Sequence, residues 1–264
     1  MKLFYKISII VFNVCLLFSA IIIPALSMAS SKNYYYSQFE KNGIYEKDGK
    51  RQTIYFVGGE YRNKAEFSDE QLNEIVDHIV DFLFGDTDSF ELSLDGVVIN
   101  GVETDNVRIF GDAAVKHMVD VKVLMRTALI GAILGCIICS ALLILFIIKR
   151  KEVAPYILKY TLIFYVILFS LIALFCIWTL IGSSGYGFLD TMWTNAHHLL
   201  FPFQPEKFEG SFFNDTLTEI LTLELFVTAV AVVMITLILS LAAWFVGVFL
   251  IKRSGTAVFS HNRK

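Results

Sequence analysis

Histidine is the residue type in this sequence best suited to moving protons, because its ordinary pKa of about 6.5 lies close to neutral pH. The chain contains five histidines: His78, His117, His197, His198 and His261. We interpret His261 as a surface residue of the C-terminal tail. His78 lies beside Asp77 and near Asp81, on the predicted polar face of a helix. We therefore interpret it as a solvated side chain too.

The other three histidines lie close to points where the chain enters an apolar segment, and each has a polar neighbour that can fix one tautomer of its ring. Asp120 follows His117 by about one helical turn, and Asn195 precedes His197 by two residues. Histidines in such settings can act as general acid and general base. The alternative is structural. His117 would then be a packing residue, while His197 and His198 would anchor a loop at the lipid headgroups.

Other kinds of catalytic site find little support in the sequence. Three histidines could bind zinc, but there is no HExxH motif. The four cysteines all lie inside apolar segments: Cys15, Cys136, Cys139 and Cys176. The GxSxG, Walker A and GxGxxG motifs are absent, as is a paired-carboxylate signature. We therefore expect no metal, no cofactor and no nucleotide, and the formal net charge of −3 is too small to indicate a nucleic-acid partner.

Long apolar segments must position these side chains. The chain is 56% hydrophobic, with a mean hydropathy of +0.62, whereas soluble domains contain about 45–50% apolar residues. A helix needs about 20 apolar residues to cross a bilayer, and the segments that qualify are Ile7–Met28, Leu124–Ile148, Tyr156–Gly182 and Leu223–Ile251. The first could be a cleaved signal peptide. Because it exceeds the usual apolar stretch of about 7–15 residues in such peptides, we expect a retained helix.

Basic residues indicate how the chain is oriented, because Lys and Arg near a span favour the cytoplasm. They cluster before the first span, after the second and after the fourth: Lys2, Lys6, Lys149, Arg150, Lys151, Lys252, Arg253, Arg263 and Lys264. We therefore expect a multi-pass protein with both termini in the cytoplasm. The expected parts are a stub and first span (1–29), an extracytoplasmic domain (30–123), the second span (124–148), a cytoplasmic loop (149–155), the third span (156–182), an extracytoplasmic loop (183–222), the fourth span (223–251) and a cytoplasmic tail (252–264).

The first extracytoplasmic segment has the pattern of a small folded domain. Ser68 and Gln71 match a capping box, and apolar residues recur behind them at helical spacing as far as Gly85. Short β-like runs flank this helix: Gln52–Val57, Phe90–Leu94, Val97–Asn100 and Val107–Phe110. The expected fold class is an α-helical integral membrane protein with four transmembrane helices. It carries a small α+β extracytoplasmic domain between helices 1 and 2, and an apolar outer loop between helices 3 and 4.

The expected site lies where these extracytoplasmic segments meet the membrane. Asp112 is a plausible N-cap, and from Ala113 the chain reads as helix without a breaker into the second span. This places His117 on a rigid element about two turns above the membrane. The second extracytoplasmic segment is unusually apolar, and we expect Leu199–Phe203 to lie at the lipid interface.

Three segments carry a resemblance to a known family. The stretch from Phe110 to Lys122, FGDAAVKHMVDVK, resembles a family segment that ends in His-Met-x-Asp-Val before the second span. The stretch from Phe188 to Phe201 resembles the family's outer-loop segment, with His198 where the family usually has Glu. Leu223-Glu224-Leu225-Phe226 occupies the place of its Leu-Pro-Glu-x-Phe. The family is that of the bacterial lipoprotein intramolecular transacylases, first catalogued as four-span proteins of unknown function.

The resemblance implies an acyltransferase in the bacterial cell membrane, with its active site on the extracytoplasmic face. An acyl chain would move within a diacylglyceryl lipoprotein, from the glyceryl ester to the α-amino group of the N-terminal cysteine. The implied partners are lipidated lipoprotein N-termini and membrane lipid, without nucleic acid or nucleotide. The implied catalytic pair is His117 and His197, with His117 as the base, and the supporting residues are Asp120, Asn195, His198 and Glu224.

A second interpretation comes from a different functional class. The acidic extracytoplasmic domain could bind a partner or sense the envelope in a protein without enzymatic activity. In that case the extracytoplasmic histidines would be dispensable, and the exposed face of the Ser68–Gly85 helix would carry the function.

Overall fold

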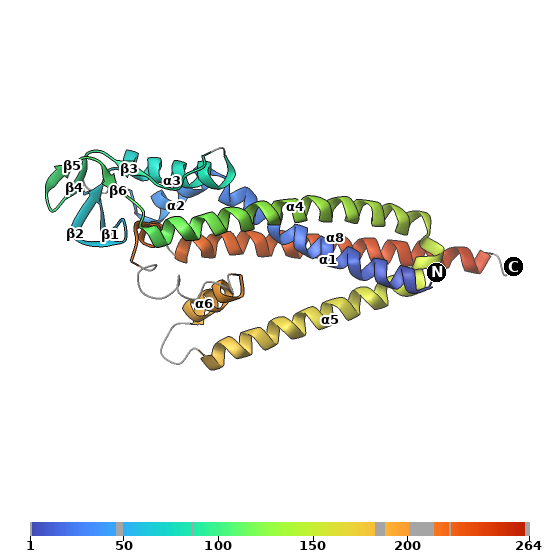
Figure 1. Cartoon of the computed structure of the whole chain (residues 1–264). Coiled ribbons are helices and arrows are strands. Elements are labelled where there is room, and N and C mark those ends of the chain that lie inside the picture. The colour runs from blue at the N-terminus through green and yellow to red at the C-terminus, as the bar shows by residue number, and fades with distance from the viewer. Residues whose placement is uncertain are drawn as a thin grey trace. The chain divides into compact units, whose positions relative to one another are not determined.

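The computed structural model describes residues 2–45, 50–85, 87–182, 188–200, 214–221 and 223–261. The chain divides into two compact units, each of which is described by itself. The helical unit comprises Met1–Ile23, Ile130–Phe203 and Val233–Lys264, and the α+β unit comprises Pro24–Leu129 and Gln204–Val232. Figure 1 labels the elements of both units.

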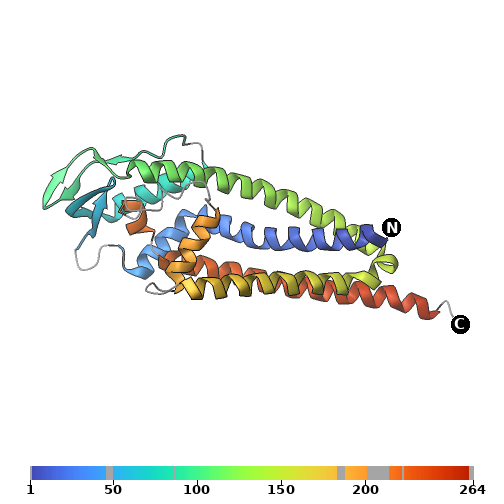
Figure 2. The ribbon, with the colours of Figure 1, turned by 60° about the horizontal axis from the view of Figure 1, so that its bottom comes forward.

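The helical unit is built from four long apolar helices. They are α1 (Lys2–Ala29), α4 (Asp112–Ile148), α5 (Arg150–Gly182) and α8 (Leu223–His261). All four are long and apolar enough to cross a membrane, which confirms the prediction of four spans. Figures 1 and 2 show that the beginning of α1 and the end of α8 lie at the same end of this unit.

A buried polar residue joins three of these helices. Asn13 on α1 is fully buried. Its side-chain amide donates to the Ile9 carbonyl at 2.7 Å and to Thr161 Oγ1 of α5 at 3.4 Å. Trp244 Nε1 of α8 donates to Asn13 Oδ1 at 2.9 Å. In a bilayer a polar group must find its partners within the protein, so this asparagine fixes how α1, α5 and α8 pack.

The α+β unit contains a four-stranded antiparallel sheet. Its order is β1 (Gln52–Val57), β2 (Glu60–Phe67), β4 (Val97–Ile99) and β5 (Val102–Thr104). A separate pair joins β3 (Ser93–Leu94) to β6 (Val107–Arg108), so the runs predicted at 90–94 and 107–110 form strands only in part. Sequence analysis missed β2, because most of its side chains face solvent and only Ala65 and Phe67 are buried.

Two helices pack on the core of this unit. They are α2 (Lys32–Asn42) and α3 (Asp69–Phe84). The predicted capping box at Ser68 and Gln71 is present, and α3 ends at the predicted Gly85. The core is rich in fully buried phenylalanines: Phe39, Phe67, Phe82, Phe90 and Phe110. It also takes in Ala114 and Met118 of α4, so the first turns of that helix are packed into the α+β unit.

Candidate functional site

The N-terminal end of α4 differs from the prediction in how it is capped. Asp112 is the first helical residue and not its N-cap. The Gly111 carbonyl accepts the first helical hydrogen bond, from Val115 N at 3.0 Å. The Asp112 carboxylate instead accepts from Arg108, which lowers the pKa of Asp112. The prediction of Asp112 as N-cap was therefore wrong, because its side chain pairs with Arg108 of strand β6, four residues earlier.

His117 lies in the second turn of α4 and is only 5% exposed. Its helical neighbours Ala114 and Met118 belong to the core of the α+β unit. Asp120, one turn further along, is half-buried. A histidine held in this way keeps a fixed position, which a general base needs in order to reach the proton it removes.

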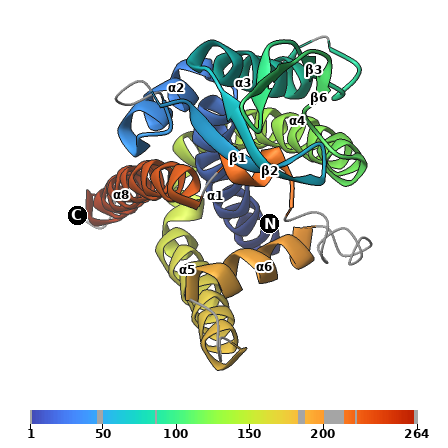
Figure 3. The same cartoon turned by 90° about the vertical axis from the view of Figure 1, so that its left-hand side faces the viewer.

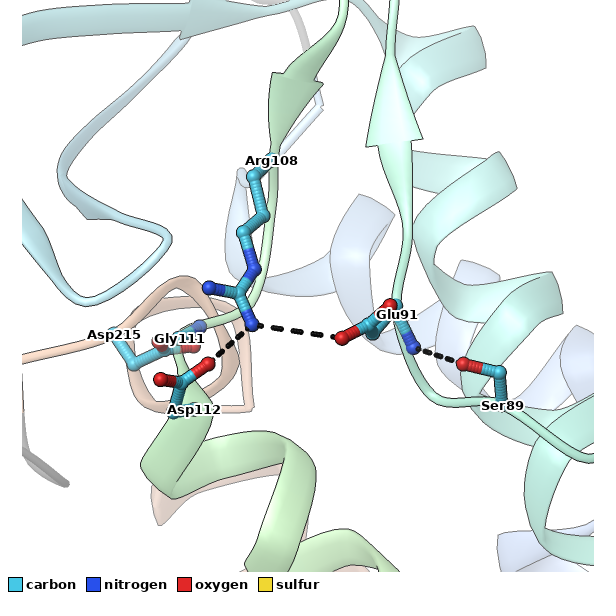
Figure 4. A network of polar contacts seen from close by, with 6 residues as sticks. All are labelled: Ser89, Glu91, Arg108, Gly111, Asp112 and Asp215. Atoms are coloured by element: carbon cyan, nitrogen blue, oxygen red, sulfur yellow. Dashed lines mark hydrogen bonds and ion pairs between the residues drawn. The ribbon is translucent and has the colours of Figure 1, made fainter.

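A buried carboxylate that sequence analysis missed holds the residue in front of α4. Asp215 is 1% exposed and is the N-cap of the short helix α7 (Thr216–Ile220). Its Oδ2 accepts from Gly111 N at 2.7 Å, and its Oδ1 accepts from Leu217 N at 3.1 Å. Burial raises the pKa of Asp215, and the two backbone hydrogen bonds and Arg108 oppose that rise. Figure 4 shows Asp215 beside Gly111, with Arg108 nearby.

Glycines allow the backbone to come this close to the carboxylate. A Cβ atom on Gly111 would lie 2.9 Å from Asp215 Oδ2 and 2.9 Å from the Gly59 Cα. Gly58 and Gly59 form the β1–β2 turn with φ angles of +65° and +77°, which favour glycine. Gly58 N also donates to the Ile109 carbonyl at 2.8 Å. The turn, the segment before α4 and Asp215 thus form one close-packed junction.

Two more side chains attach α7 to the sheet. The Glu219 carboxylate accepts from Tyr55 N at 2.9 Å and from Phe56 N at 2.8 Å. Both amides point the same way because the β1–β2 register is irregular at this point. The Thr216 hydroxyl lies 2.8 Å from the Ile109 carbonyl oxygen, to which it donates. Helix α7 therefore packs against β1, an edge strand of the sheet that is labelled in Figure 3, and Glu219 takes up two of its backbone amides.

His78 does not have the solvated position predicted for it. Its ring lies 5.7 Å from the Phe90 ring and 6.4 Å from the Phe110 ring, centroid to centroid, and is nearly parallel to the latter. Burial lowers the pKa of His78, against a smaller rise from a hydrogen bond to the Phe90 backbone. The surface interpretation was wrong because aromatic residues outside α3 cover a position that helical spacing alone places on the polar face.

The remaining predicted histidines lie on a helix of the helical unit. This helix, α6 (Phe188–Leu200), packs against α5. Asn195 and His197 are half-buried and His198 is exposed. Successive residues of a helix are about 100° apart, so His197 and His198 present different faces. Leu199 and Leu200 are exposed, in keeping with the predicted lipid-facing stretch, whose part beyond Leu200 lies outside the described residues.

The start of α8 carries the last candidate, Glu224, whose side chain lies outside the described part of the structure. The backbone of this turn is held by Tyr34, whose hydroxyl donates to the Leu225 carbonyl at 2.6 Å. Burial raises the pKa of Tyr34, while a hydrogen bond with the Ala229 backbone lowers it. One hydroxyl therefore contacts two consecutive turns of α8.

The candidates thus fall into three groups, each on its own helix. His117 and Asp120 lie together on α4, Asn195, His197 and His198 on α6, and Glu224 at the start of α8. Among the described residues, no group of three His, Cys, Asp or Glu side chains is arranged to hold a metal ion. The chemistry that such groups can support directly is proton transfer and hydrogen bonding to a carbonyl.

Comparisons with known proteins place the chain in a family. Residues 7–226 match the family described as "Lipoprotein intramolecular transacylase Lit". No curated protein matches the sequence. A solved structure, that of the membrane integral lipoprotein intramolecular transacylase Lit from Bacillus cereus, shares the fold. It is 15% identical with a TM-score of 0.56, over 100% of this chain and 99% of that chain. Because the family match spans most of the sequence, this four-span membrane protein belongs to the lipoprotein intramolecular transacylases and is an acyltransferase.

Proposed function

We propose that the chain transfers an acyl chain within a diacylglyceryl lipoprotein, from the glyceryl ester to the α-amino group of the N-terminal cysteine. The product is an N-acyl lyso-lipoprotein. The observation that carries the proposal is the buried His117, which lies in the segment that resembles the family's His-Met-x-Asp-Val and on a helix fixed by a packed core. Family membership supports the reaction class but not the individual residues.

The proposed reaction exchanges an ester for an amide. The α-amino group, with an ordinary pKa of about 7.7–8.0, is partly protonated at neutral pH and needs a base before it can attack. The amine nitrogen bonds to the ester carbonyl carbon while His117 takes up a proton from that nitrogen. The carbon–oxygen bond to the glyceryl group then breaks, and the glyceryl oxygen receives the proton. No atom is oxidised or reduced, so the scheme needs no cofactor.

Positioning is the main task of the enzyme, since the amine and the ester belong to one molecule. Well-oriented intramolecular reactions gain about 7–11 kcal/mol over their bimolecular counterparts. In our proposal His197 polarises the carbonyl or relays the proton, and Asn195 supplies a further hydrogen bond to the oxyanion. Asp120 and Glu224 support the arrangement, and His198 takes the place that Glu usually has in the family.

We place the site at the extracytoplasmic face of a bacterial membrane. The basic clusters after the second and fourth spans support this orientation. Further support comes from the beginning of α1 and the end of α8, which lie at one end of the helical unit (Figures 1 and 2). The substrate is then a lipoprotein anchored in the outer leaflet. The alternative of a protein without enzymatic activity is set aside, because the chain belongs to an enzyme family.

The test is mass spectrometry of lipoprotein N-termini in a bacterial host that lacks this activity. Expression of the wild-type chain should convert diacylglyceryl lipoproteins to the N-acyl lyso-form, with no change in total acyl content. His117→Ala, expressed and inserted to the same level, should leave the diacylglyceryl form in place. Absence of conversion by the wild type would refute the proposed reaction, and full conversion by His117→Ala would refute the assignment of the base.

A further inference from the structure

The buried Asp215 has no role in the reaction scheme, yet it contacts the residue from which α4 begins. We propose that Asp215 is a positioning residue, which fixes the first turn of α4 and through it the location of His117. This inference rests on the proposed function in one respect only: His117 is taken to be the base. The attachment itself is a property of the α+β unit, to which both residues belong.

The connection from Asp215 to His117 is short and consists of hydrogen bonds and helix. Asp215 Oδ2 accepts from Gly111 N at 2.7 Å, and the Gly111 carbonyl accepts from Val115 N at 3.0 Å. His117 follows Gly111 by six residues, which amounts to about 9 Å along a helix axis. A shift of Gly111 is therefore passed to His117 by a rigid element, with no flexible joint between them.

The segment in front of α4 is held from two sides, and α7 supplies one of them. The Ile109 carbonyl accepts from Gly58 N of the β1–β2 turn at 2.8 Å and from the Thr216 hydroxyl at 2.8 Å. The Gly111 amide donates to Asp215, and Gly111 packs against Gly59 with no space for a Cβ atom. Asp215 thus supplies the last restraint before the helix starts.

A carboxylate suits this place better than another polar group. Each of its two oxygens accepts one backbone amide, from Gly111 and from Leu217. Its negative charge faces the N-terminal end of α4 and the Arg108 guanidinium, both of which favour an anion. Arg108 in turn contacts the exposed Asp112 and Glu91, as Figure 4 shows. An asparagine keeps the shape but turns an N–H group toward one of the two amides.

The experiment uses the full-length protein in lipid nanodiscs with a synthetic diacylglyceryl lipopeptide. We expect Asp215→Asn to lower kcat by roughly tenfold and Asp215→Ala by more, with KM changed less than about twofold, because misplacement of a catalytic group acts on the chemical step. Glu91→Gln is the matched control. Glu91 belongs to the same polar network, but its side chain is 68% exposed and contacts Arg108 at 3.9 Å. The kcat of Glu91→Gln should therefore equal that of the wild type.

Hydrogen–deuterium exchange tests the attachment without relying on activity. In Asp215→Asn the amides from Gly111 to Val115 should exchange faster, by about tenfold, while those of α3 exchange as in the wild type. Unchanged exchange at the start of α4 would overturn the inference. The inference would also be overturned if the activity of Asp215→Asn and Asp215→Ala fell only in proportion to the amount of folded protein, since Asp215 would then only stabilise the fold.

The two proposals can fail separately. If the wild type converts no lipopeptide, or His117→Ala converts it fully, the proposed function or its base is wrong, while the exchange measurement still decides whether Asp215 fixes α4. If the wild type is active, His117 is essential and Asp215→Ala keeps the wild-type kcat, only the positioning role is wrong.

Discussion

The hydroxyl of Tyr34 on α2 donates a hydrogen bond to the carbonyl oxygen of Leu225 at the start of α8, 191 residues further along the chain and 2.6 Å away. This contact holds the turn that carries Glu224, and the sequence gives no sign of it. Tyr34 comes from the first extracytoplasmic segment and Leu225 from the beginning of the fourth span. The bond therefore connects two parts of the α+β unit that the chain itself leaves far apart.

Removal of this hydroxyl should weaken the start of α8. We expect Tyr34→Phe to lower the free energy of unfolding by about 0.5–1.5 kcal/mol, the usual net contribution of one hydrogen bond. Denaturant unfolding in detergent micelles measures the change. Tyr61→Phe, at a position that is 65% exposed, is the control and should leave stability unaltered. Equal stability of Tyr34→Phe and the control would show that the bond contributes nothing.

Loss of the proposed base should reduce turnover strongly without unfolding the protein. General acid–base catalysis typically contributes about 10²–10⁴-fold, so His117→Ala should lose that factor in kcat. His117→Gln should be no better, because an amide cannot take up a proton. The measurement is lipopeptide conversion per mole of folded protein, and His261→Ala in the C-terminal tail serves as the control.

The two proposed catalytic histidines should behave as a unit. His197→Ala should be about as damaging as His117→Ala, and the double variant should be little worse than either single variant, because groups that act together are not additive. His198→Ala should also be impaired if His198 has taken over the place of the family's Glu. If the fold-loss of kcat in the double variant equalled the product of the two single losses, His117 and His197 would act independently.

His78 should make stability depend on pH in a defined direction. Burial lowers its pKa below the ordinary value of about 6.5, so the folded state disfavours the charged ring. The contribution of His78 to the stability of the fold is fully present above the pKa that His78 has in the unfolded chain. It is lost as the pH falls through the lower pKa that His78 has in the folded state. The thermal midpoint of the wild type should therefore decrease when the pH is lowered from about 7.5 to about 5.

A variant isolates this contribution of His78 from the other titrating groups. His78→Phe keeps an aromatic ring beside the stacked pair of Phe90 and Phe110 but removes the ionisable nitrogens. Its midpoint should fall less over the same pH range, whereas His261→Ala should follow the wild type. The same decrease in His78→Phe as in the wild type would mean that His78 stays solvated and does not titrate within the aromatic cluster.

The proposed orientation can be checked with single cysteines in a variant whose four native cysteines are replaced by Ala. Ser93→Cys and Asn214→Cys lie at exposed positions of the α+β unit, and an impermeant thiol reagent should label both in intact cells. Ser254→Cys, near the end of α8, should react only after the membrane is permeabilised. Labelling of Ser254→Cys in intact cells, with Asn214→Cys protected, would show that the chain has the opposite orientation.

Several features follow from the sequence alone, because neighbouring residues encode them. The four spans depend only on the length and composition of apolar segments. The caps of helix α3, Ser68 and Gly85, could be predicted because the capping box and the glycine act within a few residues of the helix they delimit. The family could also be predicted from the sequence, because its short motifs around His117 and His197 are each formed by neighbouring residues.

Only the tertiary structure decides which distant residues meet. Helical spacing places His78 on a polar face, but Phe90 and Phe110 come from beyond α3 and cover it. Asp215 and Glu219 lie in a stretch without periodicity, and their carboxylates find backbone amides at Gly111 and Phe56, 104 and 163 residues away. Every residue except proline carries a backbone N–H group, so no pattern of side chains in the sequence predicts which amide such a carboxylate binds. Strand β2 was missed for a related reason: it is stabilised by hydrogen bonds to β1 and β4 and not by an apolar pattern of its own.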